Sequence, residues 1–458
     1  MTRNRTRSRP RSATTSRLCP WIAAASLGAA AAHAQDGAGQ TPDAAPPIEA
    51  AIHGQLTLTE QAALAFASPY RGPQSLDPAT RGRETTDLTL YAGFRPWSGA
   101  EIWMNPEIDQ GYGLDDTLGL AGFPSAEAYK VGDAAPYLKL PRLFLRQTIN
   151  LGGEAQSVDG DSNQFAGRQT ADRLVVTVGK FAVTDVFDTN KYAHDPRSDF
   201  LNWTVVDTGV FDYAADAWGY TLGAAAEWYQ GRWTLRTGVF DLSVVPNSEH
   251  LDSTFGQFQL VSEAEERHTI AGHEGKIAVT AFVTRARMGK FDNAIALGEA
   301  TGAAPSTALV RRYRSRTGVS LNVEQNLTSQ IGLFVRAGAA QSDVEPYEFT
   351  DVDNTAAIGL SVAGKSWGRA GDTVGLAGVI NDISAIHRAY LAAGGLGILV
   401  GDGRLPHAAP EQIVETYYKA ALSAQVEVTL DGQLIVNPAY NADRGPAPVI
   451  AVRLHGHF

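Results

Sequence analysis

The last eleven residues of this 458-residue chain, Pro448–Phe458, read PVIAVRLHGHF. One face of the two-residue alternation is apolar: Ile450, Val452, Leu454 and Phe458. The other face carries charged or imidazole side chains: Arg453, His455 and His457. A strand of this length and pattern fits a tilted crossing of an outer membrane. It equally fits a half-buried strand of a soluble sandwich, so the rest of the chain has to decide.

The first 34 residues have the pattern of a secretory signal peptide. Six arginines precede an apolar run, and Ala32-His33-Ala34 forms a small-x-small cleavage site. Residues 35–51 are rich in small and turn-forming residues, which predicts a flexible periplasmic lead-in. The single cysteine, Cys19, lies within the signal, so we expect neither disulfides nor thiolate metal sites in the exported chain.

The charge balance argues against one class of partner. The chain holds 38 basic and 49 acidic side chains, and the predicted signal contains six of the basic ones and no acid. The exported part therefore has 32 against 49, a net charge of −17. Such an acidic chain does not favour nucleic acid. No later window offers about 20 consecutive apolar residues, so a membrane location would require a closed β-barrel.

Alternating segments bounded by turn residues recur along the whole chain. We count sixteen, an even number, as a single-chain bacterial barrel requires. They are 52–60, 84–95, 99–109, 140–150, 171–180, 214–229, 232–241, 256–270, 275–288, 311–325, 330–341, 353–364, 372–382, 412–428, 430–437 and the terminal strand. The predicted fold is an all-β, transmembrane antiparallel β-barrel over residues 52–458.

The connections between these segments alternate in length. If both ends of the chain lie in the periplasm, all eight long connections fall outside the cell, and most others have two to seven residues. The connection 151–170 is the exception. Long extracellular loops and short periplasmic turns are typical of outer-membrane barrels, whereas a sandwich has no reason to alternate in this way. Within the seventh long loop, apolar residues at helical spacing predict a helix over 383–393.

Polar side chains predicted to face the lumen define a candidate constriction. Charges belong inside, because on the lipid face each costs about 2–4 kcal/mol at the midplane. The residues that we expect there are Glu101, Trp103, Glu107, Asp109, Arg142, Arg146, Glu324 and Arg336. Opposed guanidinium and carboxylate groups suit sugar hydroxyls, and an indole can stack on a pyranose ring. The alternative is that these charges only pair with one another and keep the lumen wet.

The connection 181–213 is long enough to fold inward and narrow the pore. Its candidate constriction residues are Asp185, Asp188, Asp195 and Arg197. The alternative is a solvated surface loop. The acids show no EF-hand-like spacing, and the sequence has no His-Glu-x-x-His zinc motif. We therefore expect no enzyme activity, no cofactor and no metal site, although a glycosidase-type carboxylate pair remains compatible with so many acids.

Several stretches have a familiar order. They are Glu101–Glu107 (EIWMNPE), Arg142–Arg146 (RLFLR), 152–154 (GGE), 178–181 (VGKF) running on to 188–192 (DTNKY), 200–203 (FLNW), 415–418 (ETYY), 431–433 (DGQ), 437–441 (NPAYN), 443–446 (DRGP) and 453–458 (RLHGHF). Over nearly all the exported chain, they resemble the carbohydrate-selective porins of bacterial outer membranes, the OprB-type family. The chain departs from that pattern at Gly432, where an aromatic residue is expected, and at Gly456-His457, which bears on substrate preference rather than fold.

The resemblance implies a sixteen-stranded barrel with inward-folded loops and a constriction of arginine, acidic and aromatic side chains. It also implies diffusion of mono- or oligosaccharides, and it makes Phe458 the C-terminal signal that the barrel-assembly machinery recognises. The expected function is thus a passive sugar porin in the Gram-negative outer membrane, surrounded by its lipid. Lipid-facing aliphatic rows permit a monomer or a homotrimer.

Two other functions stay open at this point. Within the transport class, the chain could be a broad diffusion pore for small polar or anionic solutes. From another class, it could be a secreted soluble β-protein that binds or hydrolyses glycans.

Overall fold

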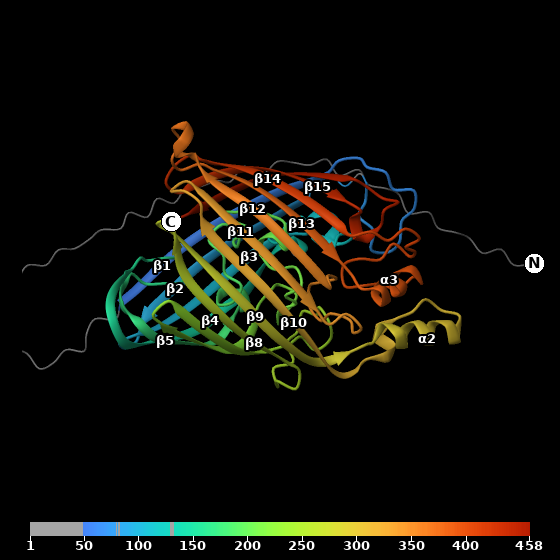
Figure 1. Cartoon of the computed structure of the whole chain (residues 1–458), viewed down its shortest axis with the longest axis horizontal. Coiled ribbons are helices and arrows are strands. Elements are labelled where there is room, and N and C mark those ends of the chain that lie inside the picture. The colour runs from blue at the N-terminus through green and yellow to red at the C-terminus, as the bar shows by residue number, and fades with distance from the viewer. Residues whose placement is uncertain (1–48, 79, 81–82, 129–131) are drawn as a thin grey trace, which may run out of the picture. The chain divides into compact units, whose positions relative to one another are not determined.

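The computed structural model describes residues 49–458 except 79, 81–82 and 129–131, and these residues form a closed antiparallel barrel of sixteen strands (Figure 1). Each strand pairs with the next along the chain, and β16 closes the ring on β1. The strands are β1 Glu49–Ala63, β2 Arg83–Arg95, β3 Ala100–Gly111, β4 Asp133–Val158, β5 Gly167–Phe181, β6 Thr221–Gln230, β7 Trp233–Asp241, β8 Phe258–Ile270, β9 His273–Met288, β10 Arg312–Asn326, β11 Ile331–Ala340, β12 Asn354–Ala363, β13 Thr373–Asp382, β14 Glu411–Ala421, β15 Val426–Val436 and β16 Ala447–His457. The predicted fold class is confirmed. The predicted signal peptide and most of the lead-in, residues 1–48, lie outside the described residues.

The ring closes through the terminal strand. β1 and β16 pair from Gln55 opposite His457 to Ala63 opposite Val449. One step further, the Phe458 N–H donates to the Gly54 carbonyl at 3.0 Å, and the Gly54 N–H donates back at 3.1 Å. The Phe458 ring lies against Gly54, where a Cβ atom would stand 2.4 Å from it. The last residue therefore belongs to the seam that closes the barrel.

The barrel wall is apolar outside and polar inside. On β16, Ile450, Val452 and Leu454 are exposed, whereas Arg453 and His455 are buried. The other strands repeat this alternation, so exposed aliphatic side chains cover the outer wall. A soluble protein rarely exposes such a large apolar surface, which argues against the secreted soluble alternative.

The connections are long at one end of the barrel and short at the other. Those after odd-numbered strands have ten to 39 residues, and those after even-numbered strands have two to nine. Because outer-membrane barrels keep short turns in the periplasm, the long connections are extracellular. Among the described residues, no helix is both long and apolar enough to cross a membrane.

Short helices lie in the connections of the described chain. They are η1 Leu114–Thr117, η2 Val183–Asp185, α1 Trp203–Val206, α2 Phe291–Thr301, η3 Thr307–Val310, η4 Gly364–Trp367, α3 Ala385–Ala392 and η5 Pro438–Tyr440. α3 confirms the helix predicted over 383–393, and its first N–H groups are capped by the Ser384 hydroxyl. α2 was not predicted, and it packs on α3 through Phe291 and Tyr390, whose ring centres are 4.9 Å apart.

Three strands differ from the prediction by seven residues or more at one end or both. β4 is 26 residues long rather than eleven and runs on to Val158. Residues 214–220 are buried loop rather than strand, since the Ala214 N–H donates to the Gln259 side chain at 2.9 Å instead of to a neighbouring strand. The predicted strand 412–428 is broken by the turn 422–425. Alternation cannot mark a strand end where the adjoining loop is itself buried.

Candidate functional site in the barrel lumen

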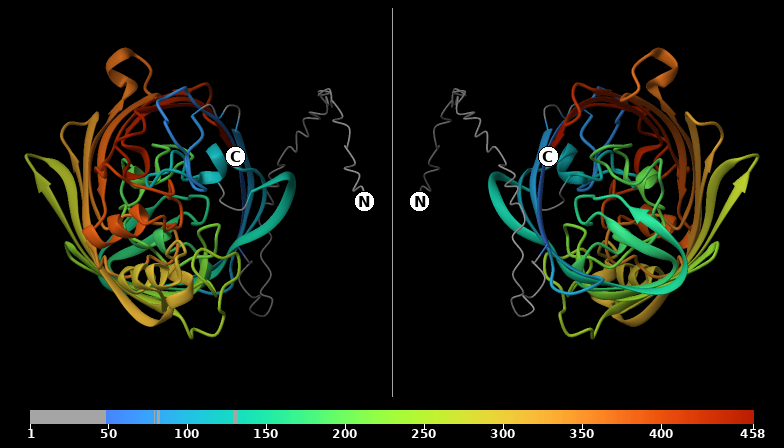
Figure 2. Two further views of the ribbon diagram at one scale, coloured as in Figure 1. Left: turned by 90° about the vertical axis from the view of Figure 1, so that its right-hand side faces the viewer. Right: turned by 90° about the vertical axis from the view of Figure 1, so that its left-hand side faces the viewer.

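The connection between β5 and β6, residues 182–220, folds into the ring of strands (Figure 2). Its Asp188 carboxylate accepts a hydrogen bond from the Asn322 amide of β10 at 2.7 Å. The Arg336 guanidinium of β11 donates to the Val205 carbonyl at 2.6 Å and lies 3.6 Å from Asp188. Asp188 and Arg336 are fully buried. This pair therefore fastens the loop to the wall.

Further anchors tie the same loop to β14 and β16. The Glu415 carboxylate accepts the Leu201 N–H at 2.5 Å. The Arg453 guanidinium donates to the carbonyls of Pro196, at 2.5 Å, and Asp199, at 3.0 Å. The loop thus bridges the lumen from β5 and β6 to the opposite wall. Open space is left on the side of β1, β2, β4 and β5.

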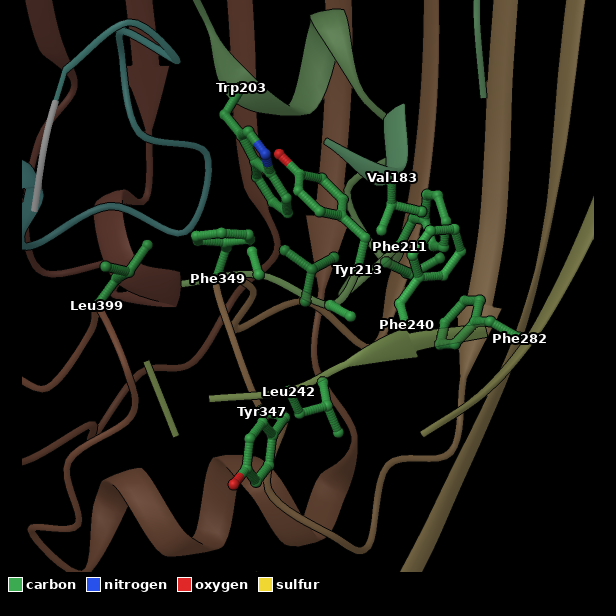
Figure 3. Packing of buried hydrophobic residues seen from close by; sticks show 14 of the residues in the cluster. Val183, Trp203, Phe211, Tyr213, Phe240, Leu242, Phe282, Tyr347, Phe349 and Leu399 are labelled. Carbon is green, nitrogen blue, oxygen red and sulfur yellow. The ribbon is translucent and has the colours of Figure 1, made fainter. Parts of the chain in front are cut away.

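An apolar core supports the loop from within the barrel (Figure 3). Phe211 of the loop packs on Phe282 of β9 with ring centres 5.3 Å apart. Tyr213 packs on Phe349 of the β11–β12 connection at 5.0 Å. The lumen is therefore partly filled by packed side chains, and water is confined to what the loops leave. Such a core fixes the position of the loop backbone.

The space left beside the loop includes a polar cavity of about 410 Å³. Gln55, Tyr91, Arg142 and Thr177 line it from β1, β2, β4 and β5. Residues 161–164 of the periplasmic β4–β5 turn line one end, and residues 218–220 of the extracellular loop line the other. Because the cavity extends from the periplasmic turn towards the extracellular loop, it is the candidate path for a solute.

Arg142 is held in the cavity wall by an acid and a tyrosine. Its Nε and Nη2 atoms donate to the two oxygens of Asp185 at 2.8 and 2.7 Å. Its guanidinium carbon lies 4.9 Å from the ring centre of Tyr220. Burial alone would raise the pKa of Asp185, but the paired Arg142 charge outweighs burial and holds that pKa below its ordinary value. The bidentate pair orients the guanidinium for further hydrogen bonds.

Arg146, four residues further along β4, contacts the periplasmic turn. Its Nη1 atom donates to the Asn163 carbonyl at 2.8 Å and lies 3.6 Å from Glu101. Glu101 also accepts hydrogen bonds from Arg95 and from the Trp103 indole, both at 3.1 Å. Arg146 therefore ties the tip of the turn to the barrel wall.

Arg197 of the loop is surrounded by carboxylates. Asp87, Glu107 and Glu127 lie 3.4, 3.5 and 3.0 Å from its guanidinium. The Asp195 carboxylate accepts the Arg197 backbone N–H at 2.9 Å. Burial raises the pKa of Glu127 well above its ordinary value, although Arg197 opposes this shift. The group as a whole carries more acid than base.

Asp207 is a buried acid of the loop that also lines the cavity. The Tyr213 hydroxyl donates to its carboxylate at 3.3 Å. Burial, with the nearby Asp188 charge, raises the pKa of Asp207 to about 7. Its charge therefore changes near neutral pH.

The structure brings five of the twelve predicted lumen residues to this cavity. They are Arg142, Arg146, Asp185, Asp195 and Arg197. Glu101 and Glu107 stand behind them as partners of Arg146 and Arg197.

The other five lie inside the barrel but away from the cavity wall. Trp103 is fully buried against Phe165, with ring centres 4.9 Å apart, so its face cannot stack on a solute in this arrangement. Asp188 and Arg336 fasten the loop, as described above. Glu324 accepts the Lys191 N–H at 2.7 Å near the periplasmic end, and Asp109 is buried on β3 opposite Tyr137. Alternation predicted that these side chains face the interior of the barrel, but it could not predict that some of them would pack against the loops instead of lining the cavity.

Several lining residues were not predicted. Tyr91 could have been found, because it lies on the inward face of β2. Trp218 and Tyr220 were assigned to a strand, although they belong to the loop. Asn163 lies in a turn that was expected only to connect two strands, and no signal in the sequence marks its return into the lumen.

Two catalytic spacings in the sequence are incidental. Residues 359–366 (GLSVAGKS) match a phosphate-binding P-loop, and 364–368 (GKSWG) match a serine-hydrolase elbow. Both motifs require a strand followed by an α-helix. Here β12 passes through the short helix η4 directly into β13, as a hairpin. In the described part of the chain, no group of three or more His, Cys, Asp or Glu residues is placed to hold a metal ion.

A closed sixteen-strand barrel with an apolar outer wall, an inward-folded loop and a polar cavity defines a porin of the bacterial outer membrane. Residues 73–458 match the family model described as "Carbohydrate-selective porin, OprB family", and the chain belongs to this family. The family and the fold indicate a channel rather than an enzyme.

Pseudomonas putida OprB shares the fold. The high-pH structure of Pseudomonas putida OprB matches with a TM-score of 0.68 and 15% identity, covering 89% of this chain and 94% of that chain. The low-pH structure of the same protein has a TM-score of 0.48 and 12% identity, covering 89% of this chain and 92% of that chain. Acinetobacter baumannii OccAB1 has a TM-score of 0.46 and 10% identity, covering 89% of this chain and 96% of that chain. At 15% identity the likeness to the high-pH structure concerns the fold alone. No curated protein sequence matches the chain.

Proposed function

We propose that this porin conducts neutral sugars by passive diffusion, and that the cavity beside the 182–220 loop is its selectivity site. The observation that carries the proposal is the pairing of Arg142 with Asp185 beside the ring of Tyr220, in the wall of the cavity. Oriented guanidinium and carboxylate groups suit hydroxyls, and a tyrosine ring offers an apolar face to a pyranose. The family description supports the same solute class.

The size of the cavity supports a small solute. Its volume of about 410 Å³ lies within the range of about 300–1,000 Å³ that is typical of small-molecule sites. Trp103 does not line the cavity, and the aromatic side chains that do line it include Tyr91, Tyr220 and Trp218. We therefore place the selectivity site at Arg142, Arg146, Asp185, Asp195 and Arg197, with these three aromatic residues.

The charges of the cavity disfavour the anion-porin alternative. Its lining includes three arginines and five acids, namely Arg142, Arg146, Arg197, Glu127, Asp161, Asp185, Asp195 and Asp207. The raised pKa values of Glu127 and Asp207 reduce the negative charge, so the wall is close to balanced at neutral pH. A balanced polar wall suits neutral solutes, whereas an anion filter needs an excess of positive charge. A broad diffusion pore for small polar solutes remains the second candidate.

The double variant Arg142→Ala plus Arg146→Ala tests the site. In liposome swelling, we expect the variant to lose the preference for hexoses over inert solutes of the same size, because the oriented donors are gone. Arg173→Ala is the matched control: this arginine stands on β5, stacked on Tyr229 at 3.6 Å and outside the cavity lining. An unchanged hexose preference in the double variant would refute the site, and equal rates for all small solutes in the wild type would favour the broad pore.

We also propose that residues 1–34 are removed on export and that 35–48 remain as a periplasmic lead-in. The basic and apolar pattern of the sequence supports this. Mass spectrometry of the protein from outer membranes should give a mature chain that begins at Gln35. A chain that begins at Met1 would contradict the proposal.

A further inference from the structure

Basic residues concentrate at the extracellular end of the β9–β10 hairpin. The segments 285–290 (RARMGK) and 311–316 (RRYRSR) hold seven of the 38 basic residues in a chain of net charge −11. They flank the connection that carries α2. Such a local excess of positive charge in an acidic protein calls for a physical account.

Four of the seven have a polar or charged partner in this chain. Arg311 pairs with Glu345 at 2.8 Å, Lys290 with Asp343 at 2.6 Å, buried Arg316 lies 3.6 Å from Asp212, and Arg314 donates to the Met288 carbonyl at 3.2 Å. These residues stabilise the extracellular end of the hairpin.

Of the other three, Arg312 is exposed at the start of β10, whereas Arg285 and Arg287 lie on the outer face of β9 and are exposed there. Across the strand ladders, Phe258 and Ser315 stand opposite Arg285, and Tyr313 stands opposite Arg287. No carboxylate occupies these opposing positions. The Arg285 guanidinium lies 5.9 Å from the Tyr313 ring centre and 3.5 Å from the Ser315 hydroxyl.

The position of the two arginines corresponds to the boundary of the membrane. Below them, the outward residues Val279 and Val283 on β9 and Val319 and Leu321 on β10 are exposed and apolar. Arg285 is eight residues beyond Ile277, about 26 Å along the strand and roughly 20 Å along the membrane normal for a tilted strand. Its aromatic neighbours resemble the girdle that outer-membrane barrels place at the lipid interface. The guanidinium groups thus emerge at the headgroup level of the extracellular leaflet.

The strand end that carries them is fixed before any ligand binds. The Arg287 N–H donates to the Gln257 side chain at 2.8 Å. Gln257 in turn donates to the carbonyls of Ser243 and Val244 at 3.1 and 3.2 Å. The nearby acid Asp252 is engaged locally, since it accepts hydrogen bonds from Thr254 and from the Gln257 N–H.

We propose that Arg285 and Arg287 form a binding site for the phosphate groups of a phosphorylated lipid in the extracellular leaflet. A guanidinium matches phosphate oxygens in bidentate geometry, and the exposed aliphatic rows below it accommodate acyl chains. The site lies on the outside of the wall, so it is separate from the solute cavity. It depends on the placement of the barrel in the outer membrane and not on which solute the pore carries.

Lipopolysaccharide bound to the detergent-purified porin tests the proposal, with native mass spectrometry and the thermal unfolding midpoint as readouts. Because an interfacial arginine contributes about 5-fold in affinity for an anionic lipid, Arg285→Gln plus Arg287→Gln should weaken binding about 25-fold. The double Arg→Lys variant keeps the charge and should retain part of the binding. Dephosphorylated lipopolysaccharide should bind to the wild type and to the double Gln variant with equal affinity. Inorganic phosphate should not shift the thermal unfolding midpoint of the wild type.

Arg232→Gln is the matched control, because Arg232 is an exposed arginine 5.6 Å from the Trp233 ring centre at the periplasmic end of the barrel. It should bind lipopolysaccharide like the wild type. All variants should keep the wild-type single-channel conductance, which shows that they have folded. Equal lipopolysaccharide binding by the wild type and the double Gln variant would overturn the proposal. It would also be overturned if the wild type bound dephosphorylated lipopolysaccharide as tightly as the phosphorylated form.

Discussion

Asp207 makes the charge of the cavity depend on pH. Its pKa of about 7, raised by burial, means that the carboxylate is ionised at pH 8 and mostly neutral at pH 6. Acidification removes a negative charge from the wall, so the permeability to cations relative to anions should fall. The reversal potential in a salt gradient measures this permeability ratio. Asp207→Asn should show a smaller shift between the two pH values than the wild type.

The same raised pKa fixes the sign of a stability effect. A buried carboxyl that binds its proton more tightly in the folded state stabilises the fold at low pH, and this contribution is lost as pH rises through about 7.

For the reversal-potential test of the pore charge, an identical pH dependence in wild type and Asp207→Asn would contradict the prediction, because it would show that another group controls the charge of the pore.

Asp188 tests whether the loop that shapes the cavity depends on buried polar anchors. Asp188→Ala leaves Arg336 buried without its carboxylate, a change that typically costs about 3–5 kcal/mol. We expect a lower unfolding temperature and a larger, noisier single-channel current, because the loop is released from β10 and β11. Asp172→Ala, on β5 where the carboxylate accepts the Gly231 N–H of the periplasmic β6–β7 turn, should change neither property. An unaltered current in Asp188→Ala would mean that the apolar core alone positions the loop.

At the scale of elements, the β4–β5 hairpin extends beyond the barrel wall and its tip turns back to the lumen (Figure 2). Gly152 and Gly153 have φ of 121° and 82°, and the strand register shifts there, so the bend requires glycine. Phe165 of the tip packs on Trp103, and the Asn163 carbonyl accepts a hydrogen bond from Arg146. The tip therefore narrows the periplasmic end of the cavity.

Replacing residues 159–166 with a two-residue turn should widen that end. We expect a higher single-channel conductance and faster swelling with larger sugars. The matched control shortens the connection 364–372 between β12 and β13, which lies at the same end of the barrel but does not line the cavity. If both shortened proteins conduct like the wild type, the tip does not limit the passage.

The terminal strand offers a test of assembly. Phe458 adds a hydrogen-bonded pair with Gly54 to the β1–β16 seam, and the family resemblance makes it an assembly signal. Deleting Phe458 should reduce the amount of heat-modifiable barrel in the outer membrane, while the channels that do assemble keep their conductance. Normal amounts of folded barrel would count against both roles.

Most elements could be predicted because the wall obeys a simple physical rule. Lipid outside and water or packed polar groups inside impose a period of two on every strand, and this pattern is visible in the sequence. The missed elements lack such a rule. Residues 214–220 alternate like a strand but pack as a loop. The part of β4 beyond Asn150 extends past the barrel wall, where no lipid imposes an alternating pattern.

At the scale of the whole molecule, the site was harder to predict than the barrel. The inward face of β3 and β4 could be read from sequence, and it led to Arg142 and Arg146. The sequence could not show that the loop would bind β10, β11, β14 and β16 through Asp188, Glu415 and Arg453, since those contacts join residues more than a hundred positions apart. The loop decides which inward side chains meet solute and removes Asp188 and Arg336 from the path, whereas Phe165 of the β4–β5 tip covers Trp103.

The central claim is that neutral sugars pass through the cavity beside this loop. Titration of a single wild-type channel with glucose measures it most directly. A sugar that binds in the conducting path should reduce the ion current in a saturable way, and Arg142→Ala plus Arg146→Ala should raise the half-blocking concentration. A current that falls only in proportion to solution viscosity, equally in wild type and variant, would contradict the account.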